Sequence, residues 1–564
     1  MKYILAIGFL IVLAQPSLRG QDANLPHNTL SYQYLDRLEI KSGKLNDSMY
    51  LDLREVPRQA AAAFLRKLDS SSLGAKDSFQ LQYLHNELLF EFPQLPKESK
   101  RPVLNTFYRD PANFFQINIP EFQLTINPVA YFHYGMPVTE SPTATDDEGP
   151  IYQNTRGLEL RGSVDRKVGF YAMVQENQAG LPDYVDRFVR DHRAIPGAGF
   201  YKGFGTDRTG YDYFVARGYI TASPTRHIRV QFGHDRNFIG NGYRSLLMSD
   251  FSDDYLFLKI NTNVWKLNYQ NLFTEMTDRI GSVDEPYNKK YGAFHYLSLN
   301  ISDKLNVGLF EGIIFHDRLG TGRGYDLNYL NPVIFYRSVE HDLGSPDNAM
   351  VGLNFNIFPI GNVAVYGQLV FDEFLLDNFM NRGDSSQWWG NKHGLQVGLK
   401  YVDALTIPNL DYQVEFNTVR PFTYSGITSA TSYTHFNQPL AHPLGASFRE
   451  VVNILIYRPW PFLQFRMQHV WATYGEDLDG RNYGGNILRG NQDHTGEFGY
   501  KIAGGDTRKL HLVNFTTTWQ PRHNLFLDLN ILFREESGET SSFTEPVFTT
   551  LSMRLNIPER RFDW

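Results

Sequence analysis

Apolar and polar residues alternate in many stretches of the chain beyond residue 120. The segment LDYQVEFN at 410–417, for example, places four apolar residues on one face of a strand and four polar residues on the other. This period of two predicts β-strands, and their length of about ten residues is what a strand needs to cross a bilayer. Strands of soluble β-sandwiches are shorter, about 5–6 residues on average. The pattern therefore favours a transmembrane barrel over a sandwich.

The connections between these strands alternate between short and long. Residues 223–226 (SPTR) and 302–304 (SDK) are short turns, whereas 236–253 and 316–346 are long segments. Outer-membrane barrels combine short periplasmic turns with long outer loops. We count about eighteen strands, and an even number places both ends of the barrel on the periplasmic side. The predicted fold class is therefore all-β, a transmembrane antiparallel β-barrel of about 18 strands.

The residues before the barrel follow different patterns. Residues 1–20 begin MKYILAIGFLIVLA, one lysine followed by an apolar run too short to span a membrane, which predicts a secretory signal peptide. In 54–68 and 76–90 the apolar residues recur at helical spacing. We therefore expect a small periplasmic helical element within residues 21–110, packed at the inner mouth of a barrel formed by residues 111–564.

Composition narrows the range of functions. The chain has 564 residues, no cysteine, a formal net charge of −7 and 15% aromatic residues. The lack of cysteine excludes disulfides and thiolate metal sites, and the mild charge gives no indication of nucleic-acid binding. An exported chain with amphipathic strands and no apolar helical span is expected in the outer membrane of a Gram-negative bacterium, in contact with lipid. We find no Ser/His/Asp set, and predict no enzyme, cofactor or metal.

One stretch, GHDRNFIGNGYRSLLMSDFS at 233–252, concentrates glycines and charges between two strands. It lacks the G-x-x-x-x-G-K-[ST] pattern of a phosphate-binding loop. We expect it to lie outside the barrel, with two interpretations open. In one, Arg236, Arg244 and Asp250 pair with one another and hold the loop folded. In the other, Arg236, Tyr243 and Arg244 contact a sugar ligand.

Two further long segments carry distinctive apolar residues. Trp388 and Trp389 form either a platform on which sugar rings stack or a part of the aromatic girdle at the membrane interface. Residues 320–341 contain too many apolar positions for a free loop. They pack either into the lumen, where they would constrict the pore, or on the barrel rim, and we favour the lumen.

The segment YTHFNQPLAHPLG at 433–445 offers His435, Asn437 and Gln438. Planar amides and aromatic rings are suited to carbohydrate recognition, whereas the alternative is a purely structural loop. The two prolines of this segment favour a rigid extended loop and disfavour a metal site built from its histidines.

Four segments in this order, GHDRNFIGNGYRSLLMSD, LNYLNPVIFYR, VEFNTVRPFTY and YTHFNQPLAHPLG, resemble the Wzi-type capsule-assembly outer-membrane proteins. The resemblance is greatest to the branch that includes the gliding-motility protein RemB, and it covers essentially the whole mature chain. It implies an 18-stranded barrel with a periplasmic helical bundle and an occluded lumen. It also implies a lectin-like role in holding surface polysaccharide.

Three functions follow as hypotheses. The first is a non-enzymatic outer-membrane barrel that binds or organises surface polysaccharide. The second is an accessory of gliding motility or surface-protein machinery, with motility or export proteins as partners. The third is a diffusion channel. The candidate ligand-binding residues are Arg236, Tyr243, Arg244, Trp388, Trp389, His435, Asn437 and Gln438.

Overall fold

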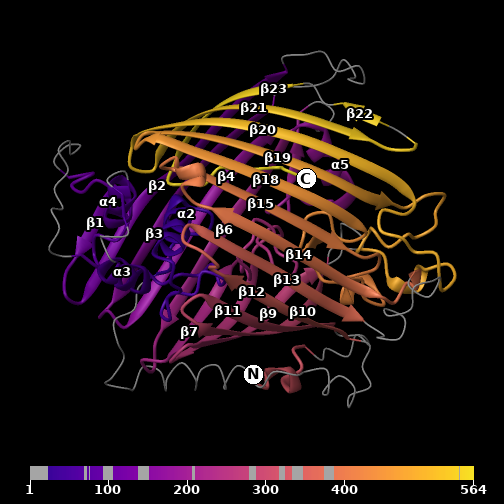
Figure 1. The fold of residues 1–564 in the computed structure, drawn as a ribbon, viewed down its shortest axis with the longest axis horizontal. Coiled ribbons are helices and arrows are strands. Elements are labelled where there is room, and N and C mark those ends of the chain that lie inside the picture. The colour runs from indigo at the N-terminus through magenta and orange to yellow at the C-terminus, as the bar shows by residue number, and fades with distance from the viewer. Residues whose placement is uncertain are drawn as a thin grey trace.

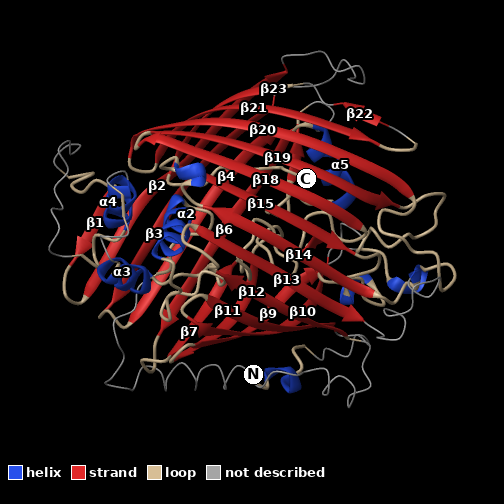
Figure 2. Cartoon of the chain, viewed as in Figure 1, coloured by secondary structure: helices blue, strands red, loops and turns tan. Residues whose placement is uncertain are grey.

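Eighteen long antiparallel strands form one closed barrel in the computed structural model (Figures 1 and 2). The described residues are 23–68, 73–74, 77–92, 106–137, 151–205, 210–278, 287–316, 324–332, 347–373, 387–540, 542–544 and 547–564. The barrel strands are β2 (Phe122–Pro137), β3 (Ile151–Val164), β4 (Val168–Gly180), β6 (Gly210–Ala222), β7 (Ile228–Asp235), β8 (Tyr255–Val264), β9 (Leu267–Asp278), β10 (Asn288–Ser302), β11 (Leu305–His316), β12 (Asn348–Ile357), β13 (Val363–Glu373), β14 (Lys392–Tyr401), β15 (Leu410–Val419), β18 (Phe448–Trp460), β19 (Leu463–Glu476), β20 (Asp506–Arg522), β21 (Leu525–Ser537) and β23 (Phe548–Leu555).

The last barrel strand pairs with the first and closes the sheet. The register joins Ala130 to Leu555 and continues to Pro137 opposite Phe548. Closure pairs the first long strand with the last, as a sheet in hydrocarbon requires. The predicted barrel of about eighteen strands is confirmed.

Short strands add to this frame. They are β1 (Phe115–Asn118) beside β2, β5 (Lys202–Phe204) beside β6, β22 (Ser542–Thr544) beside β21, and a separate hairpin of β16 (Thr434–His435) and β17 (Gln438–Pro439).

The two faces of the barrel follow the predicted alternation. In β21, Leu527, Leu529 and Ile531 are exposed on the outer face, whereas Phe526 and Asp528 are buried on the inner face. The inner face also buries polar side chains, among them Glu159, Arg161, Gln231, Lys259, Gln396 and Arg466. The inner face of the wall is therefore rich in polar side chains, while the outer surface is apolar.

Four α-helices occur in the described part of the chain, and none is long and apolar enough to cross a membrane. They are α2 (Leu30–Ser42), α3 (Arg58–Lys67), α4 (Ser78–Glu87) and α5 (Asp183–His192). The described connections also contain short 3-10 helices: η4 (Leu327–Leu330), η6 (Ala404–Thr406), η7 (Ser429–Thr431) and η8 (Asn491–Asp493).

Helices α2, α3 and α4 share a small core of their own at one mouth of the barrel (Figure 2). Their apolar stripes meet through Leu35, Phe64 and Leu84. Charged contacts join them to the barrel at this mouth: Arg37 of α2 pairs at 3.1 Å with Asp411, near the start of β15. We call this mouth the short-turn end, and the opposite mouth the long-loop end.

The connection between β7 and β8 does not lie outside the barrel, as the sequence had led us to expect. Residues 236–254, here called the plug, fold back into the lumen. Leu246, Leu247 and Met248 are fully buried in a core that includes inward side chains of the strands, such as Phe294 and Met350. An apolar run of this kind requires burial, and the wide lumen provides it.

Two other segments enter the lumen and meet the plug. From the short-turn end, Leu53 forms a bridge with Ile239, and Asp52 accepts hydrogen bonds of 2.7 Å from Tyr296 and Ser298. Residues 556–564, here called the tail, follow β23 and end inside the barrel outline, where the C label stands in Figure 1.

The expectation that 320–341 packs into the lumen is wrong for the described part, residues 324–332. Tyr329 is buried against Phe273 and Phe315, which lie on the outer face of β9 and β11. Leu327 and Leu330 are exposed. The segment packs against the outward aromatic rings of these strands and so covers part of the outside of the barrel. Residues 320–323 and 333–341 lie outside the described residues.

Candidate functional site

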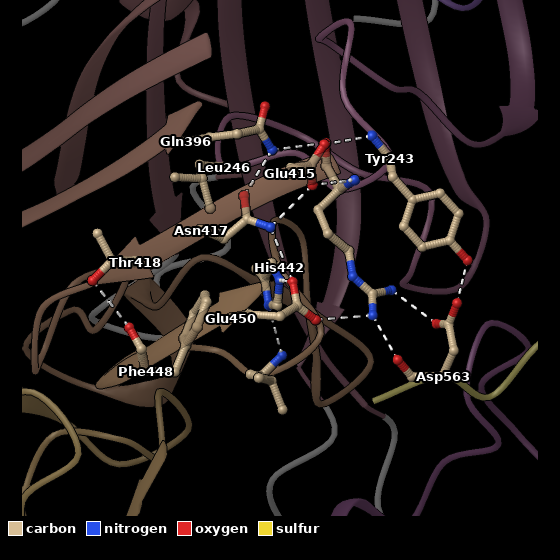
Figure 3. A network of polar contacts seen from close by, with 12 residues as sticks. Tyr243, Leu246, Gln396, Glu415, Asn417, Thr418, His442, Phe448, Glu450 and Asp563 are labelled. Atoms are coloured by element: carbon tan, nitrogen blue, oxygen red, sulfur yellow. Dashed lines mark hydrogen bonds and ion pairs between the residues drawn. The ribbon is translucent and has the colours of Figure 1, made fainter. Parts of the chain in front are cut away.

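Arg244 is the centre of a buried polar network that joins the plug to the strands and the tail. Figure 3 shows this network, with Glu450 and Asp563 among its labelled members. Its Nη1 donates to Asp563 Oδ1 at 2.9 Å, and its Nη2 donates to Glu450 Oε1 at 3.1 Å. Nη2 also donates to the backbone oxygen of Asp563 at 2.6 Å. Arg244 thus bonds two carboxylates from distant parts of the chain, and such charge-assisted bonds are the stronger kind.

The backbone of the plug is held by Glu415 on β15. The N–H groups of Tyr243 and Arg244 donate to its two carboxylate oxygens at 2.7 and 3.0 Å. This approach needs a glycine at 242, because a Cβ there would lie 2.5 Å from Glu415 Oε2. The glycine-rich sequence at 240–242 therefore serves to bring the backbone close to a carboxylate, and it does not serve to bind phosphate.

Two side chains extend the network toward the connection between β15 and β18. Asn417 donates to Glu415 at 3.0 Å and to Glu450 at 2.9 Å. His442 accepts the Leu444 N–H at Nδ1, so its Nε2–H donates to Glu450 at 2.7 Å. Burial lowers the pKa of His442, which keeps the ring neutral.

Asp563 is held as a carboxylate by its partners. Burial alone would raise its pKa, but the Arg244 guanidinium and hydrogen bonds from Tyr243 and Gln468 lower that pKa below its ordinary value. The Tyr243 hydroxyl donates to the same carboxylate. Tyr243 and Arg244, both predicted as ligand contacts, are therefore bonded within the protein.

Arg236 joins the two ends of the plug to each other and to the segment that follows α5. Its Nε donates to Asp254 Oδ1 at 2.8 Å, and Nη1 donates to the backbone oxygen of Asp250 at 3.0 Å. Its remaining nitrogen donates to the backbone oxygen of Gly197, just beyond α5. The predicted grouping of Arg236 with Asp250 thus occurs through the backbone, while Arg244 pairs elsewhere.

The predicted residues of 433–445 are also buried. His435 accepts the Thr277 N–H at Nδ1 and donates from Nε2 to the Asp254 oxygen, both at 3.0 Å. Burial lowers the pKa of His435 to about 3. Asn437 donates to the His192 oxygen at 3.0 Å, and Gln438 accepts the Gly197 N–H at 2.7 Å. The structure brings these three residues together with Arg236 around the end of α5.

Trp388 and Trp389 lie apart from this group, at the long-loop end. Their ring centroids are 5.7 Å apart, and both Nε1–H groups donate to Glu497 Oε2 at 3.0 Å. His494 stacks on Trp389 with centroids 4.2 Å apart. We call these four residues the tryptophan cluster. Both indoles are half-buried, and the Glu497 side chain is 60% exposed, so the cluster is open to solvent.

The backbone beneath the tryptophan cluster is braced from β15. Arg420, the residue after this strand, donates to the backbone oxygens of Trp388 at 3.2 Å and Asn391 at 3.0 Å. The Trp389 N–H donates to the Glu497 oxygen at 3.1 Å, which joins the two loops directly. These hydrogen bonds fix the backbone that carries the two indoles.

A cavity of about 500 Å³ occupies the part of the lumen that the plug leaves free. It extends from the tail to residues 460–464 at the short-turn end. Its lining includes Arg161, Arg217, Arg466 and Arg554 from the strands. Within the described residues, no group of three or more His, Asp or Glu side chains could hold a metal ion.

Sequence reasoning missed Asp563 and Glu497 as members of these clusters. Asp563 lies in a short tail without periodicity, and Glu497 lies in a long polar loop. Glu415 was identified only as an inward residue of 410–417, and nothing in the local pattern indicates which loop backbone it would bind.

The sequence matches no family model and no curated protein. The structure is similar to that of Wzi from Escherichia coli, described as an outer-membrane protein involved in group 1 capsule assembly and a carbohydrate-binding β-barrel. The TM-score is 0.57 at 12% sequence identity, covering 96% of this chain and 100% of that chain.

Two porins of Pseudomonas aeruginosa resemble it less. OprD gives a TM-score of 0.42 at 11% identity, covering 76% of this chain and 94% of that chain. OpdK gives 0.43 at 10% identity, covering 77% of this chain and 98% of that chain. The similarity to Wzi shows that this chain has the fold of an outer-membrane β-barrel along nearly its whole length.

Proposed function

We propose that this chain is a non-enzymatic barrel of the Gram-negative outer membrane that binds surface polysaccharide at its long-loop end and retains it there. The observation that carries the proposal is the tryptophan cluster, in which two indoles share one exposed carboxylate. The fold supports it, because Wzi, which has a similar structure, is described as a carbohydrate-binding barrel.

The chemistry of the cluster suits a sugar. The C–H face of a pyranose ring stacks on flat aromatic surface, and a neighbouring carboxylate accepts hydrogen bonds from ring hydroxyls. The indole N–H groups lower the pKa of Glu497, so it is ionised and ready to accept. Because hydrogen bonds already hold the two indoles, little side-chain ordering remains to oppose binding.

The plug supports retention rather than conduction. Buried apolar side chains from the plug and the strands fill the middle of the lumen next to the Arg244 network. Porins instead keep a water-filled channel. A purified sample in a planar bilayer is expected to show no large steady openings, and their appearance would argue for the diffusion channel instead.

A double variant, Trp388→Ala with Trp389→Ala, tests the binding site. Purified barrel in nanodiscs is presented with surface polysaccharide of the producing strain, and affinity is measured by biolayer interferometry. We expect at least tenfold weaker binding. Trp265→Ala is the matched control, because this tryptophan is 76% exposed in the turn between β8 and β9, at the other end of the barrel. Equal affinity in the double variant and the wild type would reject the site.

The second hypothesis stays a prediction: an accessory of gliding motility or surface-protein machinery, with motility or export proteins as partners. A deletion strain scored for both capsule retention and spreading on agar separates it from the proposal above. Lost capsule with normal spreading supports polysaccharide binding. Normal capsule with lost spreading supports the motility alternative.

A further inference from the structure

Arg466 on β19 is a buried cation without a hydrogen-bonding partner among the described residues. Its side chain faces the lumen, and the residue is 3% exposed. Neither terminal nitrogen of its guanidinium makes a hydrogen bond within that part of the chain. A buried charge without a partner costs several kcal/mol, roughly, so an arginine in this state indicates a missing counter-charge.

The carboxylates around Arg466 are already bonded to other groups. Asp563 accepts from Arg244 at 2.9 Å and from Gln468 at 2.6 Å. Glu559 pairs with Arg561 at 2.6 Å. The nearest aromatic contact is the ring of Tyr243, whose centroid is 5.9 Å from the guanidinium carbon. The described residues thus supply Arg466 with a π face and no carboxylate of its own.

The cavity beside Arg466 has room for a ligand and carries an excess of positive charge. Its volume of about 500 Å³ lies within the range of roughly 300–1,000 Å³ for small-molecule sites. Eleven arginine and lysine residues line it against eight aspartates and glutamates, an excess of three positive charges in a chain whose net charge is −7. This local field favours an anion.

We propose that Arg466 is the anchor of a second binding site, inside the lumen, for a small ligand that carries a carboxylate or phosphate group. A guanidinium offers two parallel N–H donors that match either group. The cavity reaches the turn between β18 and β19, lined by Trp460 and Phe462, so the ligand enters from the short-turn end. Because the tryptophan cluster lies at the opposite end, this inference stands independently of polysaccharide binding there.

Calorimetric titration of the purified full chain tests the site. Inorganic phosphate and D-glucuronate are titrated separately at low chloride concentration, with uncharged glucose as the ligand control. We expect the wild type to bind at least one of the two anions and not glucose. Binding of glucuronate alone assigns a sugar acid, and binding of phosphate alone assigns a phosphate ester. Failure of both anions to bind overturns the proposal.

Arg466→Gln keeps a polar side chain of similar reach and removes the charge. We expect it to bind the anion at least tenfold more weakly than the wild type. Arg190→Gln is the matched control, because that arginine on α5 is 63% exposed and pairs only with Asp186 among the described residues. Equal binding by Arg466→Gln and the wild type overturns the proposal, since the charge would then not hold the ligand.

A measurement on the wild type keeps the test valid if Arg466→Gln does not fold. Crystals soaked in selenate, a phosphate-like dianion with an anomalous scatterer, are expected to show a peak within hydrogen-bonding distance of the Arg466 guanidinium. The absence of that peak at saturating selenate overturns the proposal. Neither result affects the tryptophan double variant, so failure of one site is distinguishable from failure of the other.

Discussion

Arg244 and Asp563 lie 319 positions apart in the sequence and meet in the lumen at 2.9 Å between Nη1 and Oδ1. One belongs to a loop near the middle of the chain and the other to the tail after the last strand. Both side chains are almost fully buried. Their contact joins the plug to the tail and, through Glu450, to the barrel wall.

Replacing Arg244 with alanine is expected to destabilise the barrel strongly. The change leaves Glu450 and Asp563 buried without their shared cation, and breaking a buried pair in this way costs about 3–5 kcal/mol. The temperature at which the folded band disappears in heat-shifted gel mobility measures the effect. Arg190→Ala, which removes an exposed pair, is expected to change this temperature little. A similar result for both variants would contradict the structural role of Arg244.

Alanine at Gly242 is expected to distort the plug. Its Cβ would lie 2.5 Å from Glu415 Oε2 and 2.7 Å from the Arg244 oxygen, so the backbone must move away from the carboxylate. We expect a loss of about 1–3 kcal/mol, as for other overpacked buried sites, again read from the unfolding temperature. Gly361→Ala is the control, because a Cβ at that position would meet no heavy atom within 4 Å and its φ is not in the left-handed region.

His435 is expected to make the barrel sensitive to mild acid. Its pKa is about 3 in the folded state and about 6.5 when unfolded. The unfolded chain therefore binds more protons between these values, so the stability that His435 contributes is full above about pH 6.5 and is lost as pH falls toward 3. Unfolding temperature measured from pH 8 to pH 4 should fall less steeply in His435→Gln than in the wild type. Parallel curves would contradict this.

Glu87 is expected to hold the α2–α4 helices on the barrel at neutral pH. It accepts hydrogen bonds from His523 at 2.8 Å and Asn524 at 2.6 Å, both in the turn between β20 and β21. Burial would raise its pKa, but the hydrogen bond from His523 and the nearby cationic charges lower that pKa far below its ordinary value. Its contribution is thus present above the unfolded value of about 4.3 and is lost as pH falls below it.

Limited proteolysis across pH 7 to 3 measures this docking. Cleavage within residues 23–92 should increase below about pH 4 in the wild type. In Glu87→Gln it should already be raised at pH 7 and depend less on pH. Glu275→Gln, which alters a partly exposed pair with Lys289, should behave as the wild type. Unchanged cleavage in Glu87→Gln at pH 7 would show that the helices are held by other contacts.

The barrel could be predicted because its signals are local. Each strand carries its own alternation and length, so residues such as Leu527 and Asp528 reveal their faces without knowledge of any partner. The helices before the barrel could be predicted for the same reason. Whether a long connection lies outside the barrel or folds into the lumen could not be predicted, because both kinds of loop start and finish at the same ends of their strands.

The apolar run Leu246–Met248 was the available signal that the plug turns inward, and the charges beside it obscured this. Residues 324–332 showed the opposite error, since their apolar positions cover outward rings such as Phe315. The sequence pattern gave no signal for the pairing of Arg244 with Asp563, because a contact between residues 319 positions apart produces no periodicity. Trp388 and Trp389 could be selected as candidates from their type alone, whereas Glu497 could not.

The contact of the tail with the plug has a consequence for assembly in the membrane. The seam between β2 and β23 and the bond between Arg244 and Asp563 both involve the end of the chain, so neither forms until the last strand is in place. If the barrel closed first around an empty lumen, the plug would have to enter it afterwards from the long-loop end and the tail from the short-turn end. We expect instead that the strands assemble around the plug, and that the tail binds the plug as β23 pairs with β2.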